Sequence, residues 1–197
     1  MANNCLYSMK AVSASRDALD RLVKIMKYED PEYCLYRVFS AEAYNAEKKG
    51  DLNAIYIDGD VAWSPDPWFN PTQWTVENDG KTEPPDADGK RRTVRMVTFR
   101  ELCPILGIGV EVFGSEVGCE FQCHQACSPD GRIIVDDTER YTEEWEDEDG
   151  NPLDDPVCSG GLPDYGMFHS ANWLMATSSG QPAAGLGLAA SPEQATA

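Results

Sequence analysis

The sequence predicts an α+β protein: a split β-α-β sandwich with an antiparallel sheet, two helices on one face and an added C-terminal hairpin. Two stretches with helical spacing each have their own start signal, at Ser15 and at Thr98. Runs of β-type residues stand before and after each stretch, which gives the order β-α-β-β-α-β. An Asp-Gly turn at Asp130-Gly131, between two later β-type runs, predicts the hairpin.

The first part of the chain supplies one helix and three predicted strands. Residues 5–12 alternate in polarity, and Ser15 then caps a helix that the Asp30-Pro31 pair stops. Residues 33–39 and 54–63 predict two more strands. Gly59, within the latter, indicates a bulge or a close backbone approach.

Two segments of this part show no regular period. The polar residues 40–51 predict a loop or a small helix. Residues 64–92 are rich in Pro, Asp, Gly and Trp and predict a long insertion, of the kind that is usually functional or disordered.

The second helix is expected to be short. Thr98 and Glu101 have the spacing of a capping box, Gly107 closes the helix, and the interior Pro104 shortens or kinks it. Residues 108–113 predict a strand, and residues 119–127 and 132–141 form the hairpin. The expected organisation is a folded domain over residues 1–142, an acidic and irregular extension over 143–176, and a disordered tail over 177–197.

The overall charge argues against nucleic acid as a direct ligand. The 197 residues carry a formal charge of −18, so nucleic acid is repelled and a basic protein surface is the better counterpart. The N-terminal residues lack the features of a signal peptide, and no run approaches the roughly 20 apolar residues of a membrane span. We therefore expect a cytoplasmic protein that binds no membrane, whose seven cysteines are free and mostly buried.

A metal site built from cysteines is not expected. Cys119, Cys123 and Cys127 fall on one face of a strand, but the outer two are about 26 Å apart at roughly 3.3 Å per residue. His124 faces the other way, so the spacing favours a core-facing cysteine stripe and no bound metal or cofactor.

The catalytic alternative rests on two aspartates. Asp58 and Asp60 share a strand face and have the ligand chemistry for Mg²⁺-dependent phosphoryl transfer, although solvated acids at a turn or bulge are the commoner outcome. With only two histidines, His124 and His169, and no nucleophile motif, the chain offers no other catalytic residues.

The acidic run over residues 136–155 predicts a partner-binding surface. It holds eleven acids against Arg140, so it carries −10 of the total −18. Spaced carboxylates can imitate a phosphate backbone, although most such runs are simply solvated. Aromatic residues of the insertion either fold back over the sheet, the favoured outcome, or form an exposed patch. The predicted partner-binding residues are Glu139, Glu143, Glu144, Glu146, Asp147, Trp63 and Trp68.

Three short segments resemble a known family. They are Met1-Ala2-Asn3 with Cys5, Tyr56-Ile57-Asp58-Gly59-Asp60 with Trp63-Ser64, and Leu106 to Gln122 with Val110-Glu111-Val112-Phe113 at its centre. In this order they resemble the Api92-like proteins that carry the YubB-type ferredoxin-like domain. The resemblance implies a ferredoxin-like sandwich without an iron–sulfur cluster, in a protein of phages, plasmids and other bacterial mobile elements. It implies no catalytic residues.

The function predicted from these observations is protein binding. We expect a non-enzymatic accessory protein of a phage or plasmid that binds a host or mobile-element protein in the bacterial cytoplasm. In its sharper form, the acidic hairpin is a nucleic-acid mimic that blocks a basic nucleic-acid-binding protein of the host. The alternative is a metal-dependent nuclease that uses Asp58 and Asp60.

Overall fold

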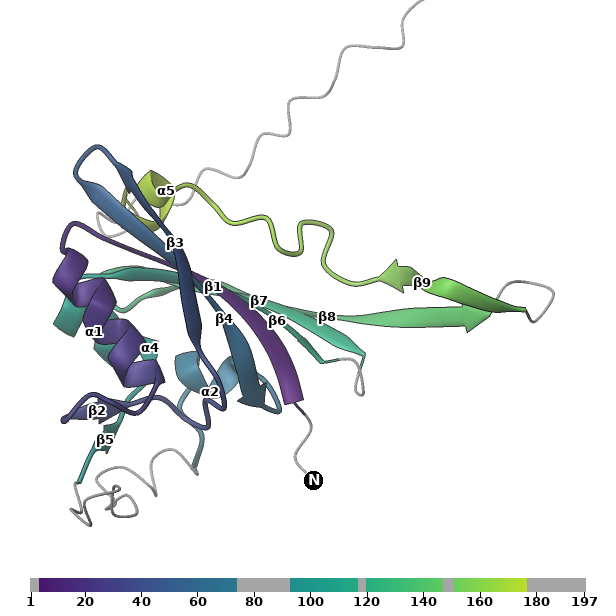
Figure 1. The fold of residues 1–197 in the computed structure, drawn as a ribbon, viewed down its shortest axis with the longest axis horizontal. Coiled ribbons are helices and arrows are strands. Elements are labelled where there is room, and N and C mark those ends of the chain that lie inside the picture. Colours follow the sequence, from purple (N-terminus) through teal and green to yellow (C-terminus); the bar gives the residue numbers. More distant parts are fainter. Residues whose placement is uncertain (1–3, 74–92, 117–119, 147–150, 177–197) are drawn as a thin grey trace, which may run out of the picture.

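One antiparallel sheet of seven strands organises the protein, in the order β3-β4-β1-β6-β7-β8-β9 (Figure 1). The computed structural model describes residues 4–73, 93–116, 120–146 and 151–176. The strands of the sheet are β1 (Asn4–Ser13), β3 (Glu42–Lys49), β4 (Leu52–Ala62), β6 (Gly109–Glu116), β7 (Phe121–Cys127), β8 (Ile133–Glu146) and β9 (Pro152–Gly160). A separate parallel pair consists of β2 (Tyr33–Cys34) and β5 (Arg95–Met96). The helices are α1 (Arg16–Met26), α2 (Asp66–Phe69), α4 (Phe99–Leu106) and α5 (Ala171–Ala176).

The predicted ferredoxin-like split β-α-β sandwich is wrong, because the protein is mostly a large antiparallel sheet with few helices. Two unexpected strands enlarge the sheet. Residues 42–49, predicted as part of a loop or a small helix, pair with β4, and residues 152–160, predicted as irregular, pair with β8. Both are edge strands. The described side chains of β3 are exposed, so this strand has no apolar face from which its sequence would reveal it.

Both predicted helix starts are confirmed. The Ser15 Oγ accepts a hydrogen bond from the backbone N–H of Ala18 at 3.2 Å, which caps α1. The Glu101 carboxylate accepts one from the backbone N–H of Thr98 at 3.2 Å, and Gly107 ends α4 in the left-handed conformation at φ 63°. Buried side chains of α1 and α4 join one core with β1, β4, β6 and β7, on what we call the helix face of the sheet.

Helix α1 ends before the predicted stop. Its last residue is Met26, and Asp30 organises the chain beyond it by accepting hydrogen bonds from the backbone N–H groups of Glu32 and Tyr33. Arg21 of α1 donates to the same buried carboxylate through its Nε at 2.8 Å. The predicted strand over 33–39 is reduced to the two residues of β2.

The start of the long insertion folds back onto the helix face. Trp68 in α2 is fully buried, donates from its Nε1 to the carbonyl of Tyr36 at 2.7 Å, and meets the ring of Tyr7 edge-on at 4.9 Å. Phe69 packs against Phe99 of α4 at 5.1 Å. The favoured prediction that the aromatic residues Trp63, Trp68, Phe69 and Trp74 fold back is confirmed for Trp68 and Phe69. Trp63 is instead 51% exposed, and residues 74–92, which include Trp74, lie outside the described residues.

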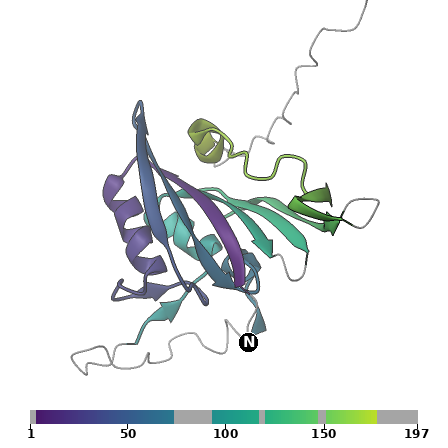
Figure 2. The same cartoon turned by 45° about the vertical axis from the view of Figure 1, so that its right-hand side comes forward.

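The second face of the sheet is covered by the C-terminal part of the chain. After β9, residues 161–170 return across the sheet and lead into α5 (Figures 1 and 2). Leu174 of α5 is buried against Val12, Ala54 and Ala126. We call this side the return face. Residues 152–160 therefore form a strand and residues 161–176 cover the sheet, in contrast to the irregular extension predicted over 143–176. The predicted tail over 177–197 lies outside the described residues.

The predicted hairpin is confirmed and continues into an arm. The N–H of Gly131 donates to the carbonyl of Ser128 at 2.9 Å, which closes the turn between β7 and β8. Strand β8 is 14 residues long: its first part pairs with β7 as far as Arg140, and from Tyr141 onward it pairs with β9. The β8–β9 pair projects beyond the other strands as an arm (Figure 1).

Gly59 lies at the close backbone approach that the sequence indicated. A Cβ at this position would overlap the carbonyl oxygen of Ser40, which also accepts a hydrogen bond from the Tyr7 hydroxyl at 2.8 Å. Only glycine allows the chain after β2 to cross β4 at this distance.

Candidate functional site

Both histidines of the chain converge on one buried carboxylate on the return face. Glu111 of β6 has no exposed surface, and its Oε1 accepts hydrogen bonds from His124 Nε2 at 2.8 Å and from His169 Nδ1 at 2.6 Å. Its Oε2 accepts a third, from the backbone N–H of His169 at 2.9 Å. These bonds compensate the cost of burying the carboxylate. We call Glu111, His124 and His169 the histidine cluster.

The sheet register and the return segment bring the cluster together. On β7, His124 pairs with Phe113, two residues beyond Glu111 on β6, so the three side chains share a face. His169 lies in the return segment just before α5, and its carbonyl accepts a hydrogen bond from the Nζ of Lys10 on β1 at 2.7 Å. Three strands and one irregular segment therefore fix the cluster.

Aromatic rings hold both imidazoles in parallel planes. The His124 ring stacks on Phe113 with centroids 4.1 Å apart, and the His169 ring stacks on Trp173 of α5 at 3.8 Å. The two imidazoles are themselves parallel, at 5.8 Å. The result is a continuous row of four rings that restricts how either imidazole can turn.

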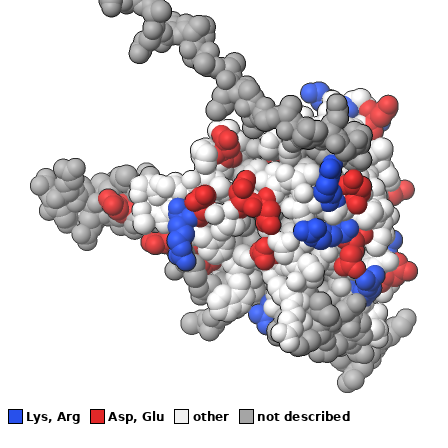
Figure 3. All heavy atoms as spheres, turned by 180° about the vertical axis from the view of Figure 1, so that it is seen from behind, with Lys and Arg blue, Asp and Glu red and all other residues white. Residues whose placement is uncertain are grey.

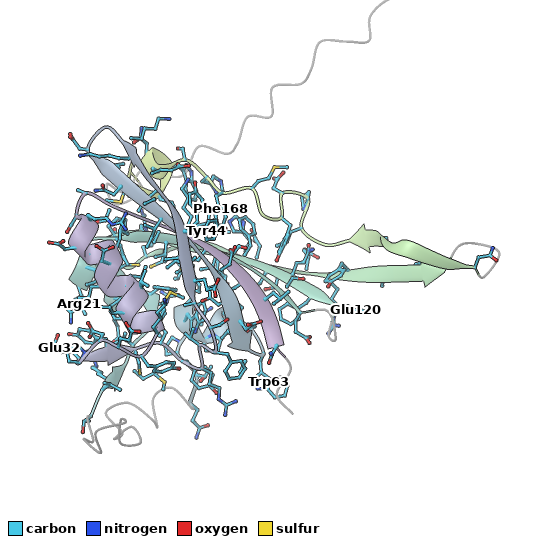
Figure 4. All side chains as sticks on the ribbon, in the orientation of Figure 1. Arg21, Glu32, Tyr44, Trp63, Glu120 and Phe168 are labelled. Carbon is cyan, nitrogen blue, oxygen red and sulfur yellow. The ribbon has the colours of Figure 1, made fainter. Side chains whose placement is uncertain are left out.

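A second aromatic group closes the cluster on the side of β3. Phe168, next to His169, packs against Phe113 at 5.2 Å and against Tyr56 at 5.7 Å. Tyr56 in turn contacts Tyr44 at 6.1 Å, near which Phe168 lies in Figure 4. The side chains of His124 and His169 keep 12% and 15% of their surface exposed, so solvent still reaches the cluster.

The cluster also has a buried cation beside it. Lys10 is largely buried, and burial lowers the pKa of its ammonium group, while the negative charges of Glu111 and Glu47 act to raise it. Its Nζ lies 5.6 Å from the centroid of the Tyr56 ring, a cation–π contact.

A pocket of about 570 Å³ lies on the helix face, between α2 and the base of the arm. Trp63, directly after β4, forms part of its wall with half of its surface exposed and a left-handed backbone at φ 72°. Its lining consists of Trp63, Ser64, Asp66, Glu116, Phe121, Cys123, Thr138, Glu139 and Arg140. We call it the arm pocket; Trp63 is labelled in Figure 4.

The arm pocket contains a carboxylate oxygen without a protein donor. Glu116 is only 3% exposed, and its Oε2 accepts no hydrogen bond from any residue that the structure describes. Asp66 is better satisfied, because its Oδ1 accepts hydrogen bonds from Gln125 at 3.1 Å and from Asn70 at 2.9 Å. Burial raises the pKa of the neighbouring Cys123 thiol to about 12, so this cysteine stays a neutral thiol.

The structure separates the residues predicted to bind a partner. Trp63 and Glu139 both line the arm pocket, and Glu144 is exposed on the arm. The prediction that Trp68 binds a partner is wrong. Its indole is buried between the sheet and α4, where no partner can reach it. The side chains of Glu143 and Glu146, and all of Asp147, lie outside the described residues.

The two aspartates of the nuclease alternative line a separate pocket of about 290 Å³ with Tyr7 and Tyr165. Asp60 accepts a hydrogen bond from the Ser40 hydroxyl at 2.8 Å, and the Oδ1 of Asp58 is buried without a described donor. Within the described ranges, no third His, Cys, Asp or Glu joins them closely enough to share a metal ion. The alternative stays a prediction.

The predicted cysteine stripe is confirmed for two of its three members. Cys123 and Cys127 are buried on the helix face, while His124 between them faces the return face, and Cys119 lies outside the described residues. In all, five of the described cysteines are buried and free.

Sequence reasoning missed the histidine cluster. Glu111 lies within an ordinary buried strand, and His169 follows 58 residues later in a segment without any motif. The signal that could have found the cluster is the scarcity of histidine. With two histidines in 197 residues, a site that uses both is a single hypothesis to consider.

Comparisons of the chain with protein-family models, with curated proteins and with solved structures found no match. The resemblance to the Api92-like proteins therefore stays a prediction. Among the described residues, no helix combines the length and the apolar character that crossing a bilayer requires.

Proposed function

We propose that this protein acts by binding a basic protein partner, with an arginine side chain of the partner in the arm pocket. The observation that carries the proposal is the position of the Glu116 carboxylate, buried and with one oxygen lacking a described donor, in a pocket whose wall includes the half-exposed Trp63. A buried acceptor without a donor costs free energy that an incoming donor recovers.

The chemistry of the pocket favours arginine over other side chains. A guanidinium group donates two parallel hydrogen bonds to a carboxylate and stacks on the face of an indole ring. The lining holds three acids, Asp66, Glu116 and Glu139, against one base, Arg140, so a cation gains from entering. A pocket of about 570 Å³ accommodates one such side chain together with its neighbours.

The negative charge of the pocket lining continues along the arm. Asp137, Glu139 and Glu144 are exposed along β8, and acidic side chains outnumber basic ones on the surface seen in Figure 3. Spaced carboxylates of this kind attract a positively charged surface over a distance and orient it before contact.

A surface that binds phosphate through arginines has the matching charge. We therefore propose that the partner is a nucleic-acid-binding protein, and that the arm takes the place of its nucleic acid. The resemblance to proteins of phages and plasmids supports a host protein as the target, with this protein as a non-enzymatic accessory factor of a mobile element.

The first test measures binding of a fluorescently labelled, arginine-rich peptide by anisotropy at two salt concentrations. We expect Trp63→Ala and Glu116→Gln each to weaken binding by about tenfold or more, as is typical of central interface residues. Binding should also weaken as salt rises, because exposed charges are screened.

Two control variants match the tested ones in chemistry but lie elsewhere. Phe39→Ala removes an aromatic side chain that is 54% exposed, and Glu42→Gln removes an exposed charge from β3. Both should bind the peptide as the wild type does. Equal binding of a lysine-rich peptide, or undiminished binding by both pocket variants, would contradict the proposed recognition.

The natural partner can then be sought by affinity capture from bacterial cells, with and without nuclease treatment. The proposal expects a basic protein that survives nuclease, is released by salt and is not retained by Glu116→Gln. A partner that disappears with nuclease would instead be held through nucleic acid.

A further inference from the structure

We infer that Glu111, His124 and His169 form a binding site for one divalent transition-metal ion, for which zinc is the best match. The inference goes beyond the proposed function and concerns the other face of the sheet. Along β6, side chains alternate between faces, and Glu111 and Glu116 are five residues apart, so one faces the return face and the other the helix face.

The spacing of the donor atoms fits a shared ion. One ligand atom from each of the three residues lies within 4.8 Å of the others. Zinc binds imidazole nitrogen and carboxylate oxygen at about 2.0–2.2 Å, so two ligands of a tetrahedral ion are roughly 3.3 Å apart. The present separations of Glu111 Oε1 from the two ring nitrogens, 2.8 and 2.6 Å, need to widen by about 0.5 and 0.7 Å to reach this spacing.

The ligand types select the class of metal. Two imidazoles and one carboxylate suit zinc, iron, cobalt, nickel or copper, whereas Mg²⁺ and Ca²⁺ prefer oxygen ligands alone. Three protein ligands leave at least one position for water, and the partial exposure of both histidines gives solvent access to it. A neutral imidazole can bind the ion once its proton has moved to the other ring nitrogen.

The surrounding contacts hold the three side chains in place without involving the atoms that would bind the metal ion, which are Glu111 Oε1 and the two ring nitrogens. The Oε2 of Glu111 is held by the backbone N–H of His169, and the carbonyl of His169 is held by Lys10. The stacked rings of Phe113 and Trp173 fix the planes of the two imidazoles. Interactions of this kind orient the ligands of metal sites and increase their affinity.

The test is a zinc titration of the untagged, metal-stripped full-length protein, by calorimetry and by competition with a chromophoric chelator. We expect one zinc ion per chain, with little competition from excess Mg²⁺. His124→Gln, His169→Gln and Glu111→Gln should each weaken zinc binding by at least about tenfold.

Control variants test whether zinc binds at this cluster or at other carboxylates and cysteine thiols of the protein. Glu116→Gln changes a buried glutamate of the same strand that faces the other side, and should bind zinc as the wild type does. The double variant Asp58→Asn with Asp60→Asn should also retain zinc. Co²⁺ in place of zinc should give a spectrum of nitrogen and oxygen ligands, without the near-ultraviolet charge-transfer band of thiolates.

A second measurement needs no variant, in case those of the cluster fail to fold. In the wild-type protein, the imidazole NMR signals of both histidines should shift together and saturate at one equivalent of zinc. The inference is overturned if the wild type binds no zinc, if the imidazole signals do not change, or if the histidine variants keep full affinity. Loss of zinc only in the double aspartate variant would place the metal at the nuclease candidate instead.

Discussion

The two faces of the sheet are buried in different ways. The helix face is covered by α1, α2 and α4, and a large cluster of apolar and aromatic side chains is buried there. The return face is covered by an irregular segment and the short α5, and it buries Glu111 and Lys10 together with two histidines. Apolar burial supplies most of the stability of a domain, whereas buried polar groups must each be compensated. The comparison indicates that the main apolar core lies on the helix face, whereas the buried histidine cluster lies on the return face.

The largest expected effect contrasts two tryptophans five residues apart. Trp68→Ala removes a fully buried indole from the helix face and should lower the free energy of unfolding by about 3–5 kcal/mol. Trp63→Ala, at the rim of the arm pocket, should change it by less than about 1 kcal/mol. Urea denaturation followed by circular dichroism measures both. Similar losses for the two variants would contradict the assignment of Trp68 alone to the core.

On the return face, we expect zinc bound at the histidine cluster to raise the free energy of unfolding. Zinc at a hundred times its dissociation constant should add up to about 2.7 kcal/mol, because it binds only the folded state. Hydrogen exchange measured with and without zinc should show slower exchange in residues 161–176 and little change in α1. Equal protection of both regions would mean that the ion acts on the whole fold.

Asp30 provides a test of the polar contacts beside the helix face. Burial raises the pKa of this carboxyl, but the hydrogen bonds from Arg21 and from the backbone N–H groups of Glu32 and Tyr33 outweigh it, so the pKa is lowered overall. Asp30→Asn should cost about 2 kcal/mol at neutral pH.

The pH dependence of this contribution follows from its sign. A carboxyl whose pKa is lower in the folded state stabilises the fold above its unfolded pKa of about 3.9, and this stabilisation is lost as pH falls through the folded value. Unfolding of wild type and Asp30→Asn at pH 7 and pH 3 should show the difference between them shrinking at the lower pH. If the free energies of unfolding of the two proteins differ equally at both pH values, the effect of the substitution comes from packing and not from the charge.

The smallest effect concerns Lys10 on the return face. Lys10→Met keeps the length of the side chain but removes the donor to the carbonyl of His169, and should cost about 1 kcal/mol. Thermal unfolding of the metal-free protein measures it. A more stable variant would show that burial of the ammonium group costs more than its hydrogen bond contributes.

Local signals were predictable from the sequence, and long-range pairing was not. The caps at Ser15 and Thr98 and the turn before Gly131 depend on a few neighbouring residues, and the structure confirms all three. The strands β3 and β9 depend on pairing with distant residues at a sheet edge, where no apolar pattern is needed. The fold class was therefore wrong although most local elements were right.

The same limit applies to the candidate sites. Trp63 and Trp68 occur in similar Pro- and Asp-rich sequence, and only the backbone path after β4 places one in the arm pocket and the other in the core. The cluster of Glu111, His124 and His169 depends on a return segment that no local pattern predicts. These three residues can be recognised as a cluster only in the three-dimensional structure.

The position of α5 has a practical consequence for anyone who shortens this protein. A fragment that ends at residue 142, the boundary suggested by the sequence, would lack Leu174 and leave Val12, Ala54 and Ala126 uncovered. It would also lose residues 143–146 of β8 and the whole of β9, so that Tyr141 and Thr142 would have no pairing strand beside them. Such a fragment should self-associate, whereas the protein that retains residues 143–176 should not.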